Sequence, residues 1–138
     1  MKISSKGLER LFAIKNLRYL KLRAGELTED AWQQLMKPNK LKIISFLDEQ
    51  IGSDKIDKIM KIAVPQLGFE EVTMAPDVLK KLKGNRRIVF LEITSPGITE
   101  TEIKEIKDSF PDHPEFGIDP ESLDGIMKDT LQHGELKL

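Results

Sequence analysis

The stretch that decides the fold is LRYLKLRAGELTEDAWQQLMKPNKL, residues 17–41. Its leucines have the spacing L-x-x-L-x-L-x-x-x-x-L, and the alternation around Leu20 and Leu22 is typical of a strand. Trp32 and Leu35 then follow at helical spacing. A strand and a helix this short cannot bury both apolar faces alone. The unit therefore requires a copy of itself on each side.

The chain supplies such copies. Offsets of 24, 23 and 24 residues carry the apolar pattern from Leu17 to Leu41, Val64 and Ile88. Each copy predicts one strand followed by one helix. The repeated spacing also predicts one row of neighbours across a common sheet, formed by Leu20, Ile44, Leu67 and Leu91.

This pattern resembles the leucine-rich-repeat family, whose signature is L-x-x-L-x-L-x-x-N/C-x-L at about 20–29 residues per repeat. The resemblance covers residues 17–111. It implies an α/β fold, a short solenoid with parallel strands on the concave side, helices on the convex side and a cap at each end. A compact α/β sandwich with a mostly parallel sheet is the competing fold, and a strand order that follows the sequence would exclude a doubly wound sheet.

The sequence departs from the family signature at one position of each repeat. Where the family has Asn or Cys, this chain has Gly25, Glu49, Val72 and Pro96. The family's side chain at this position bonds backbone groups of the turn. We therefore expect turns that are looser or differently bonded.

The repeat divides the chain into three parts. We expect a single domain, 1–138, made of an N-terminal half-repeat cap (1–16), four repeats starting at 17, 41, 64 and 88 (17–111), and a C-terminal capping segment (112–138). In the first part, Leu8 and Leu11 match the helical part of a repeat without its strand. In the last, Phe116 and Ile118 hold a weak strand position, and a helix is predicted over about 120–133.

Helix-capping residues support these boundaries. Thr28, Ser53 and Thr99 each precede a helical apolar pair and are predicted N-caps. Thr99 and Glu102 have the spacing of a capping box.

Composition indicates a soluble, folded protein. The 138 residues are 39% hydrophobic and 33% charged, and there is no cysteine for a disulfide or a thiolate metal site. The first ten residues contain no apolar leader core, and no run is long enough to span a bilayer. We expect a cytoplasmic protein without membrane contact. A secreted protein whose leader has been removed stays open as an alternative.

Catalytic and ligand-binding motifs are not evident. His113 and His133 have no carboxylate or second histidine at ligand spacing, and no glycine-rich phosphate loop occurs. Asp48 and Glu49 lack the spacing of a calcium loop. We expect no metal, no cofactor and no enzyme activity. The basic run 80–87 is interpreted as a solvated face, so we also expect no nucleic-acid binding.

Charge is distributed unevenly along the chain. Residues 1–69 hold 13 lysines and arginines against 8 aspartates and glutamates, whereas residues 70–138 hold 9 against 15. A linear stack of repeats would turn this into a basic end and an acidic end. Head-to-tail self-assembly, as a weak homo-oligomer, is therefore one functional hypothesis.

The first functional hypothesis is a non-catalytic module that binds a protein partner through the concave sheet face, as an adaptor or inhibitor typical of a short bacterial-like chain. Residues between the inward leucines point to that face, and one predicted column holds Tyr19, Ile43, Gln66 and Phe90. The predicted partner-binding residues are Arg18, Tyr19, Lys21, Arg23, Lys42, Ile43, Phe90 and Glu92. A third hypothesis, an enzyme, would need a cluster such as Asp48, Glu49 and His113.

Overall fold

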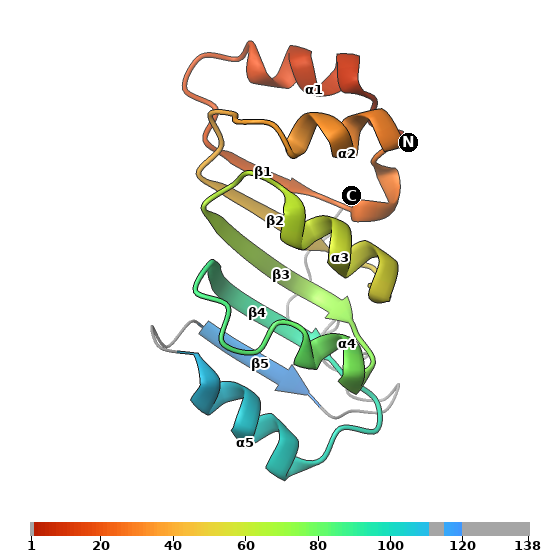
Figure 1. Cartoon of the computed structure of the whole chain (residues 1–138), viewed down its shortest axis with the longest axis vertical. Coiled ribbons are helices and arrows are strands. Elements are labelled where there is room, and N and C mark those ends of the chain that lie inside the picture. The colour runs from red at the N-terminus through yellow and green to blue at the C-terminus, as the bar shows by residue number, and fades with distance from the viewer. Residues whose placement is uncertain (1, 111–114, 120–138) are drawn as a thin grey trace, which may run out of the picture.

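The computed structural model describes residues 2–110 and 115–119. Strands and short helices alternate along the chain (Figure 1). The elements are α1 (Ser5–Phe12), β1 (Tyr19–Leu22), the 3-10 helix η1 (Ala24–Glu26), α2 (Glu29–Leu35), β2 (Ile43–Leu47), α3 (Ser53–Lys61), β3 (Gln66–Thr73), α4 (Pro76–Lys80), β4 (Ile88–Thr94), α5 (Glu100–Ser109) and β5 (Glu115–Asp119).

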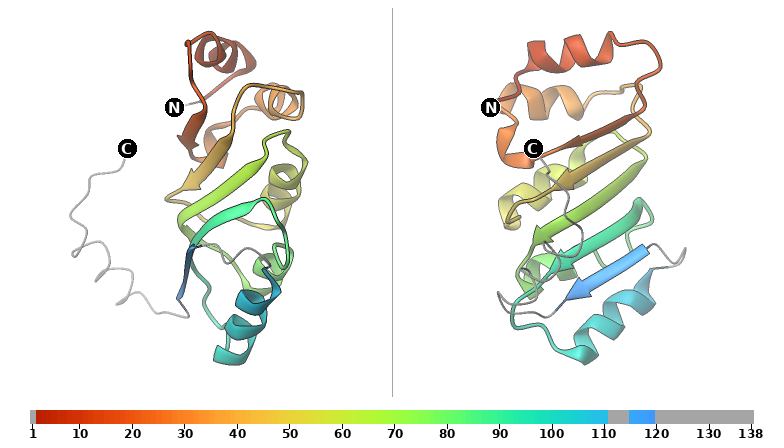
Figure 2. Two further views of the ribbon diagram at one scale, coloured as in Figure 1. Left: turned by 90° about the vertical axis from the view of Figure 1, so that its left-hand side faces the viewer. Right: turned by 180° about the vertical axis from the view of Figure 1, so that it is seen from behind.

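The strands form one parallel sheet in the order β1-β2-β3-β4-β5. The described helices lie on one face of this sheet, and the opposite face, which we call the open face, is covered by none of them (Figure 2). The predicted α/β class with a parallel sheet is confirmed. The strand order follows the sequence without the reversal that a doubly wound sheet requires.

The first three strands pair with the predicted register. Leu20 lies beside Ile44, and Ile44 lies beside Leu67. The parallel ladder begins where the amides of Lys42 and Ile43 donate to the Arg18 carbonyl oxygen. From β1 to β3, residues that the repeat offsets of 24 and 23 relate in the sequence are therefore neighbours in the sheet.

The predicted register between β3 and β4 is wrong. Leu67 pairs with Ile88, and Leu91 instead pairs with Phe69. The row of four predicted from the repeat therefore ends at Leu67. The observed rows across the four strands are Leu20–Ile44–Leu67–Ile88 and Leu22–Phe46–Phe69–Leu91.

Two irregularities shift this register. The pairing changes between Leu67 and Gly68, where β4 has one extra residue, and again between Glu70 and Val72, where Glu71 is the extra residue on β3. Glu71 has a φ of 55°, a left-handed conformation that takes it out of the ladder. Val72 is consequently buried within β3 and is not the turn residue that the repeat alignment predicts.

Arg87 fixes where β4 begins. Its guanidinium donates to the carbonyl oxygens of Met60, Ile62 and Val64 over 2.6–3.1 Å. Its own carbonyl oxygen accepts from the Leu67 amide at 2.8 Å. Residue 88 must therefore lie opposite the start of β3. Burial lowers the pKa of Arg87, and this side chain is not part of the solvated basic face that the sequence predicts.

The core lies between the sheet and the helices. The rings of Trp32 on α2 and Phe46 on β2 stack with centroids 6.3 Å apart, and Phe46 contacts Phe69 on β3 at 6.0 Å. Both phenylalanines are fully buried. Aromatic contacts of this kind add about 0.5–1.5 kcal/mol each to the burial of their apolar area. They tie β2 and β3 to the helix layer.

The helix starts agree with two of the three predicted caps. Thr99 caps α5, and its capping box with Glu102 is confirmed. Thr28 precedes α2, although its hydroxyl donates to the Ile3 carbonyl oxygen rather than capping the helix. The Ser53 prediction is wrong, because Gly52 is the N-cap of α3 and Ser53 is its first residue. The predicted helix over 120–133 lies outside the described residues.

Candidate partner-binding surface on the open face

The eight predicted binding residues lie on or beside the strands of the open face. Arg18, Tyr19, Lys21 and Lys42 are exposed, whereas Arg23, Ile43, Phe90 and Glu92 are half-buried. Leu20, Leu22, Ile44 and Phe46 point into the core, so the alternate residues of β1 and β2 face away from the helices.

The predicted apolar column is present only in part. Tyr19 pairs with Ile43, and Ile43 pairs with Gln66. Phe90 does not continue this column, because the shifted β4 register places it beside Gly68. The open face therefore has two adjacent columns, Tyr19–Ile43–Gln66 and Lys21–Ser45–Gly68–Phe90.

Tyr19 is an exposed aromatic residue of these columns, with 45% of its surface accessible. Its hydroxyl lies 3.4 Å from Ser45 Oγ, and Lys21 Nζ lies 5.7 Å from its ring centroid. These two contacts hold the ring in place while its apolar surface stays accessible. The result is a restrained aromatic side chain, which loses little conformational freedom when it binds.

Two predicted binding cations already form ion pairs within the chain. Lys21 Nζ lies 3.2 Å from Glu70 Oε2, so that a side chain of β1 reaches β3 across β2. Arg23 Nη2 lies 3.9 Å from Asp48 Oδ2. The charge distribution along the sequence predicts a basic end and an acidic end, and it gives no sign of these ion pairs within the face.

Two small residues at the centre of the open face were also not singled out. Ser45 and Gly68 are both buried, and a Cβ at Gly68 would overlap Ser45 Oγ and lie 3.5 Å from Phe90 Cβ. Glycine inside a strand often marks such a close approach, which is the signal that could have identified this position.

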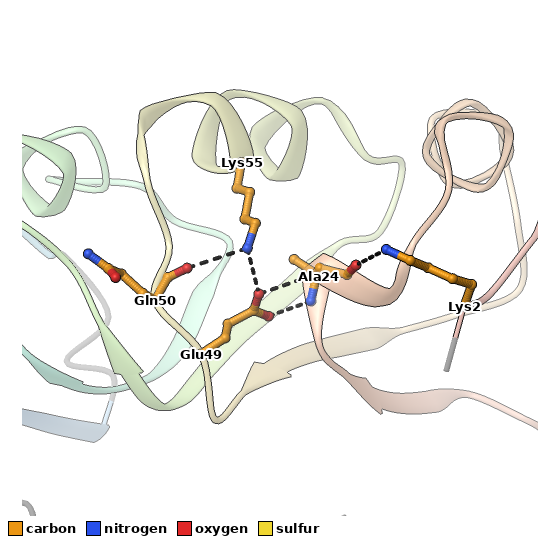
Figure 3. Close-up of polar contacts among 6 residues, drawn as sticks. Lys2, Ala24, Glu49, Gln50 and Lys55 are labelled. Carbon is orange, nitrogen blue, oxygen red and sulfur yellow. Dashed lines mark hydrogen bonds and ion pairs between the residues drawn. The ribbon is translucent and has the colours of Figure 1, made fainter.

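Figure 3 shows how Glu49 closes the turn between the first two strands. Its carboxylate accepts hydrogen bonds from the backbone amides of Ala24 and Gly25, the second at 3.1 Å. Lys55 Nζ donates to the same carboxylate at 3.1 Å, and Lys2 Nζ donates to the Gly25 carbonyl oxygen at 3.2 Å. Glu49 thus satisfies two backbone donors of the neighbouring unit.

The cluster proposed for an enzyme is not assembled among the described residues. Asp48 faces Arg23, Glu49 bonds the turn, and His113 lies outside the described part of the chain. Residues 2–110 and 115–119 contain no group of three side chains that could hold a metal ion. Within the same ranges, no helix is long and apolar enough to cross a membrane.

Two lysines of the basic run pair with neighbouring helices. Lys80 Nζ lies 2.7 Å from Glu102 Oε2 on α5, and Lys81 Nζ lies 3.2 Å from Asp57 Oδ1 on α3. The hydrogen bond from Lys80 lowers the pKa of Glu102, with smaller contributions from Thr99, and the same bond raises the pKa of Lys80. These contacts join successive units along the helix layer.

The chain matches no family model, no curated protein and no solved structure.

Proposed function

We propose that this chain is a short leucine-rich-repeat solenoid whose open face binds a protein partner without catalysis. Three features support the repeat assignment. The strands follow one another in sequence order, the helices share one face, and the first junctions repeat every 24 and 23 residues, as the pairs Leu20–Ile44 and Ile44–Leu67 show. Such stacked units bury one continuous core.

Glu49 adds support from the turn chemistry. It occupies the position at which the family signature has Asn or Cys, and it bonds the turn amides of Ala24 and Gly25. The family side chain bonds turn backbone groups in the same way. A carboxylate can therefore replace the amide or thiol here, since the groups to be satisfied are N–H donors.

The exposed ring of Tyr19 on the open face is the observation that supports partner binding best. Half-buried Ile43 lies beside it, and the exposed cations Arg18 and Lys42 flank the pair. An aromatic anchor with a charged rim is the usual composition of a protein-binding hot spot. The surface favours a partner that has an apolar pocket with acidic groups around it.

The remaining predicted residues divide between two roles. Lys21 and Arg23 position the face through their pairs with Glu70 and Asp48. Phe90 lies one column away from Tyr19 and, with Glu92, belongs to the acidic half of the same face. An adaptor or inhibitor would use this whole surface, an assignment that rests on analogy with the fold.

The test uses a partner captured by the wild-type chain and compares its affinity for three variants. Tyr19→Ala should weaken binding about thirtyfold, equivalent to roughly 2 kcal/mol for a central aromatic anchor. The double variant Arg18→Glu/Lys42→Glu should slow association and weaken binding further at low salt. Lys104→Glu/Lys107→Glu on α5 makes the same charge change away from the open face and should bind normally.

Thermal unfolding separates loss of binding from loss of folding. Lys21 and Arg23 are left unchanged in these variants, because reversing them would place like charges beside Glu70 and Asp48. All three variants should unfold within a few degrees of the wild type. Full binding by the Tyr19→Ala and Arg18→Glu/Lys42→Glu variants would contradict the assignment of the open face.

A further inference from the structure

The N-terminal end of the sheet exposes apolar side chains that are buried in the next unit. Leu17 and Leu20 are partly exposed, whereas their counterparts one repeat later, Leu41 and Ile44, are 3% and 0% exposed. Leu11 on α1 is also partly exposed, and its counterpart Leu35 is fully buried. Burial in the second unit comes from the neighbouring strand and helix, so the first unit lacks part of this cover.

The topology identifies what is missing. Ile3 forms a parallel bridge with Leu27, and α1 packs beside α2, so residues 3–12 repeat the bridge and helix of a unit. β1 is the end strand of the sheet. No described residue occupies the strand position next to β1 and opposite α1, as the view from behind in Figure 2 shows.

The other end of the sheet has the complementary composition. β5 is a parallel strand that pairs with β4 and lies at the end of the strand order. The ladder places Phe116 beside Leu91 and Ile118 beside Ile93, and Ile118 is buried. At the N-terminal end of the described residues, α1 has no strand of its own beside β1. At the other end, β5 is a strand that follows the last described helix, α5.

The charges of the two ends are opposite. Residues 2–23 contain seven lysines and arginines and a single glutamate, whereas the described residues 100–110 and 115–119 contain six aspartates and glutamates and two lysines. Contact between like ends would bring like charges together. Contact between unlike ends brings the basic β1 edge to the acidic β5 edge, so charge favours a head-to-tail arrangement.

We propose that β5 of a second copy adds in parallel beside β1, beneath α1, and completes the N-terminal half-repeat. Main-chain hydrogen bonds extend the sheet, as in other cases of strand addition. The added strand covers the partly exposed edge at Leu17 and Leu20. The contact is heterologous, so each bound copy presents a new β5 edge and the assembly propagates. This interface is the strand edge and is distinct from the partner-binding columns of the open face.

The first experiment measures the mass of the full chain by sedimentation equilibrium at increasing protein concentration. The mean mass should rise above the monomer mass at low salt. It should fall toward the monomer mass at about 1 M salt, where the screening length is roughly 3 Å. A wild-type chain that stays monomeric up to millimolar concentration at low salt overturns the proposal, whether residues 120–138 or another protein covers the edge.

The second experiment tests the polarity of the contact with two complementary blocked chains. Tyr19→Pro removes an edge N–H from β1, because the Arg18 carbonyl oxygen faces β2 and the next residue therefore faces outward. Glu115→Lys/Asp119→Lys reverses the charge of β5. Each variant alone should be monomeric, and their equimolar mixture should form a dimer of twice the monomer mass with nothing larger.

Folding is monitored by circular dichroism, and Leu17→Lys serves as a second block of the β1 edge if Tyr19→Pro lowers the helix content. Leu17 is only partly buried, so a lysine there keeps its charged end in water in the monomer. Assembly of either blocked chain alone, or a mixture that stays monomeric, overturns head-to-tail pairing of β5 with β1. Because neither readout involves the external partner, the outcome is independent of the proposed function.

Discussion

The two halves of the sheet are held together in different ways. From β1 to β3 the pairing is regular, and each residue lies beside the one that the apolar repeat predicts. From β3 to β4 the register shifts twice, and Leu67 lies beside Ile88 although the repeat predicts Leu91. The regular half is specified by a row of apolar residues, whereas the shifted half is specified by individual contacts of Arg87 and Gly68.

The largest expected effect tests the Arg87 contact. Arg87→Met leaves three carbonyl oxygens, at the end of α3 and just after it, without this donor. We expect the free energy of unfolding to fall by about 3 kcal/mol. This is less than the sum expected for three charged hydrogen bonds, because water partly screens the guanidinium. Denaturant unfolding measures the change.

Arg86→Met is the matched control for Arg87→Met. Arg86 is exposed, so removing its charge should change the stability by no more than about 0.5 kcal/mol. Arg87→Lys should recover only part of the loss, because an ammonium group cannot reproduce the planar fork. Equal stability of the Arg86 and Arg87 variants would mean that the guanidinium does not hold the β3–β4 junction.

The second prediction concerns the point where the two halves meet. Gly68→Ala should destabilise the chain by about 2 kcal/mol, the usual cost of overpacking, because the new methyl group meets Ser45 Oγ. In Gly68→Ala/Ser45→Ala the hydroxyl is gone, and the double variant should be more stable than the sum of the two single changes predicts. Strictly additive effects would show that Ser45 is not the obstacle.

The third prediction concerns the regular half. Glu49→Ala removes the acceptor for the amides of Ala24 and Gly25 and should lower the unfolding free energy by about 1 kcal/mol. Gln50→Ala, an exposed neighbour, is the control and should change the stability by less than about 0.5 kcal/mol. A larger loss of unfolding free energy for Glu49→Ala than for Arg87→Met would mean that individual polar contacts matter more in the regular half than in the shifted half.

The same contrast explains what the sequence could predict. The parallel sheet, its strand order and the register of β1 to β3 follow from apolar spacing alone, since burial of one face fixes the register. The β3–β4 register depends on the left-handed conformation of Glu71 and on the backbone contacts of Arg87, and neither has a spacing signal. Phe90 was therefore placed in the wrong column.

The sequence predicts which residues of β1 and β2 lie on the open face, but it does not predict which of their side chains form ion pairs. Tyr19 and Ile43 are neighbours on the open face, as the repeat offset of 24 residues predicts. The ion pair between Lys21 and Glu70 joins residues 49 positions apart on strands that are not adjacent. Lys21 and Glu70 meet only because their long side chains extend across β2, and a repeat alignment does not show how far a side chain extends.

The smallest expected effect lies in the helix layer and depends on pH. Hydrogen bonds from Lys80 and then Thr99 hold the pKa of Glu102 below its usual value of 4.5. A carboxylate whose pKa is lowered on folding contributes stability above its unfolded pKa, and this contribution disappears as the pH falls through the folded value. Glu102→Gln should therefore lower the melting temperature slightly at pH 7, and the difference from wild type should shrink below about pH 4.5.

Glu105→Gln on the same helix is the control, since Glu105 influences Lys80 through charge alone. A difference for Glu102→Gln that stays constant from neutral to acidic pH would assign its effect to packing of α5 rather than to the ionised carboxylate.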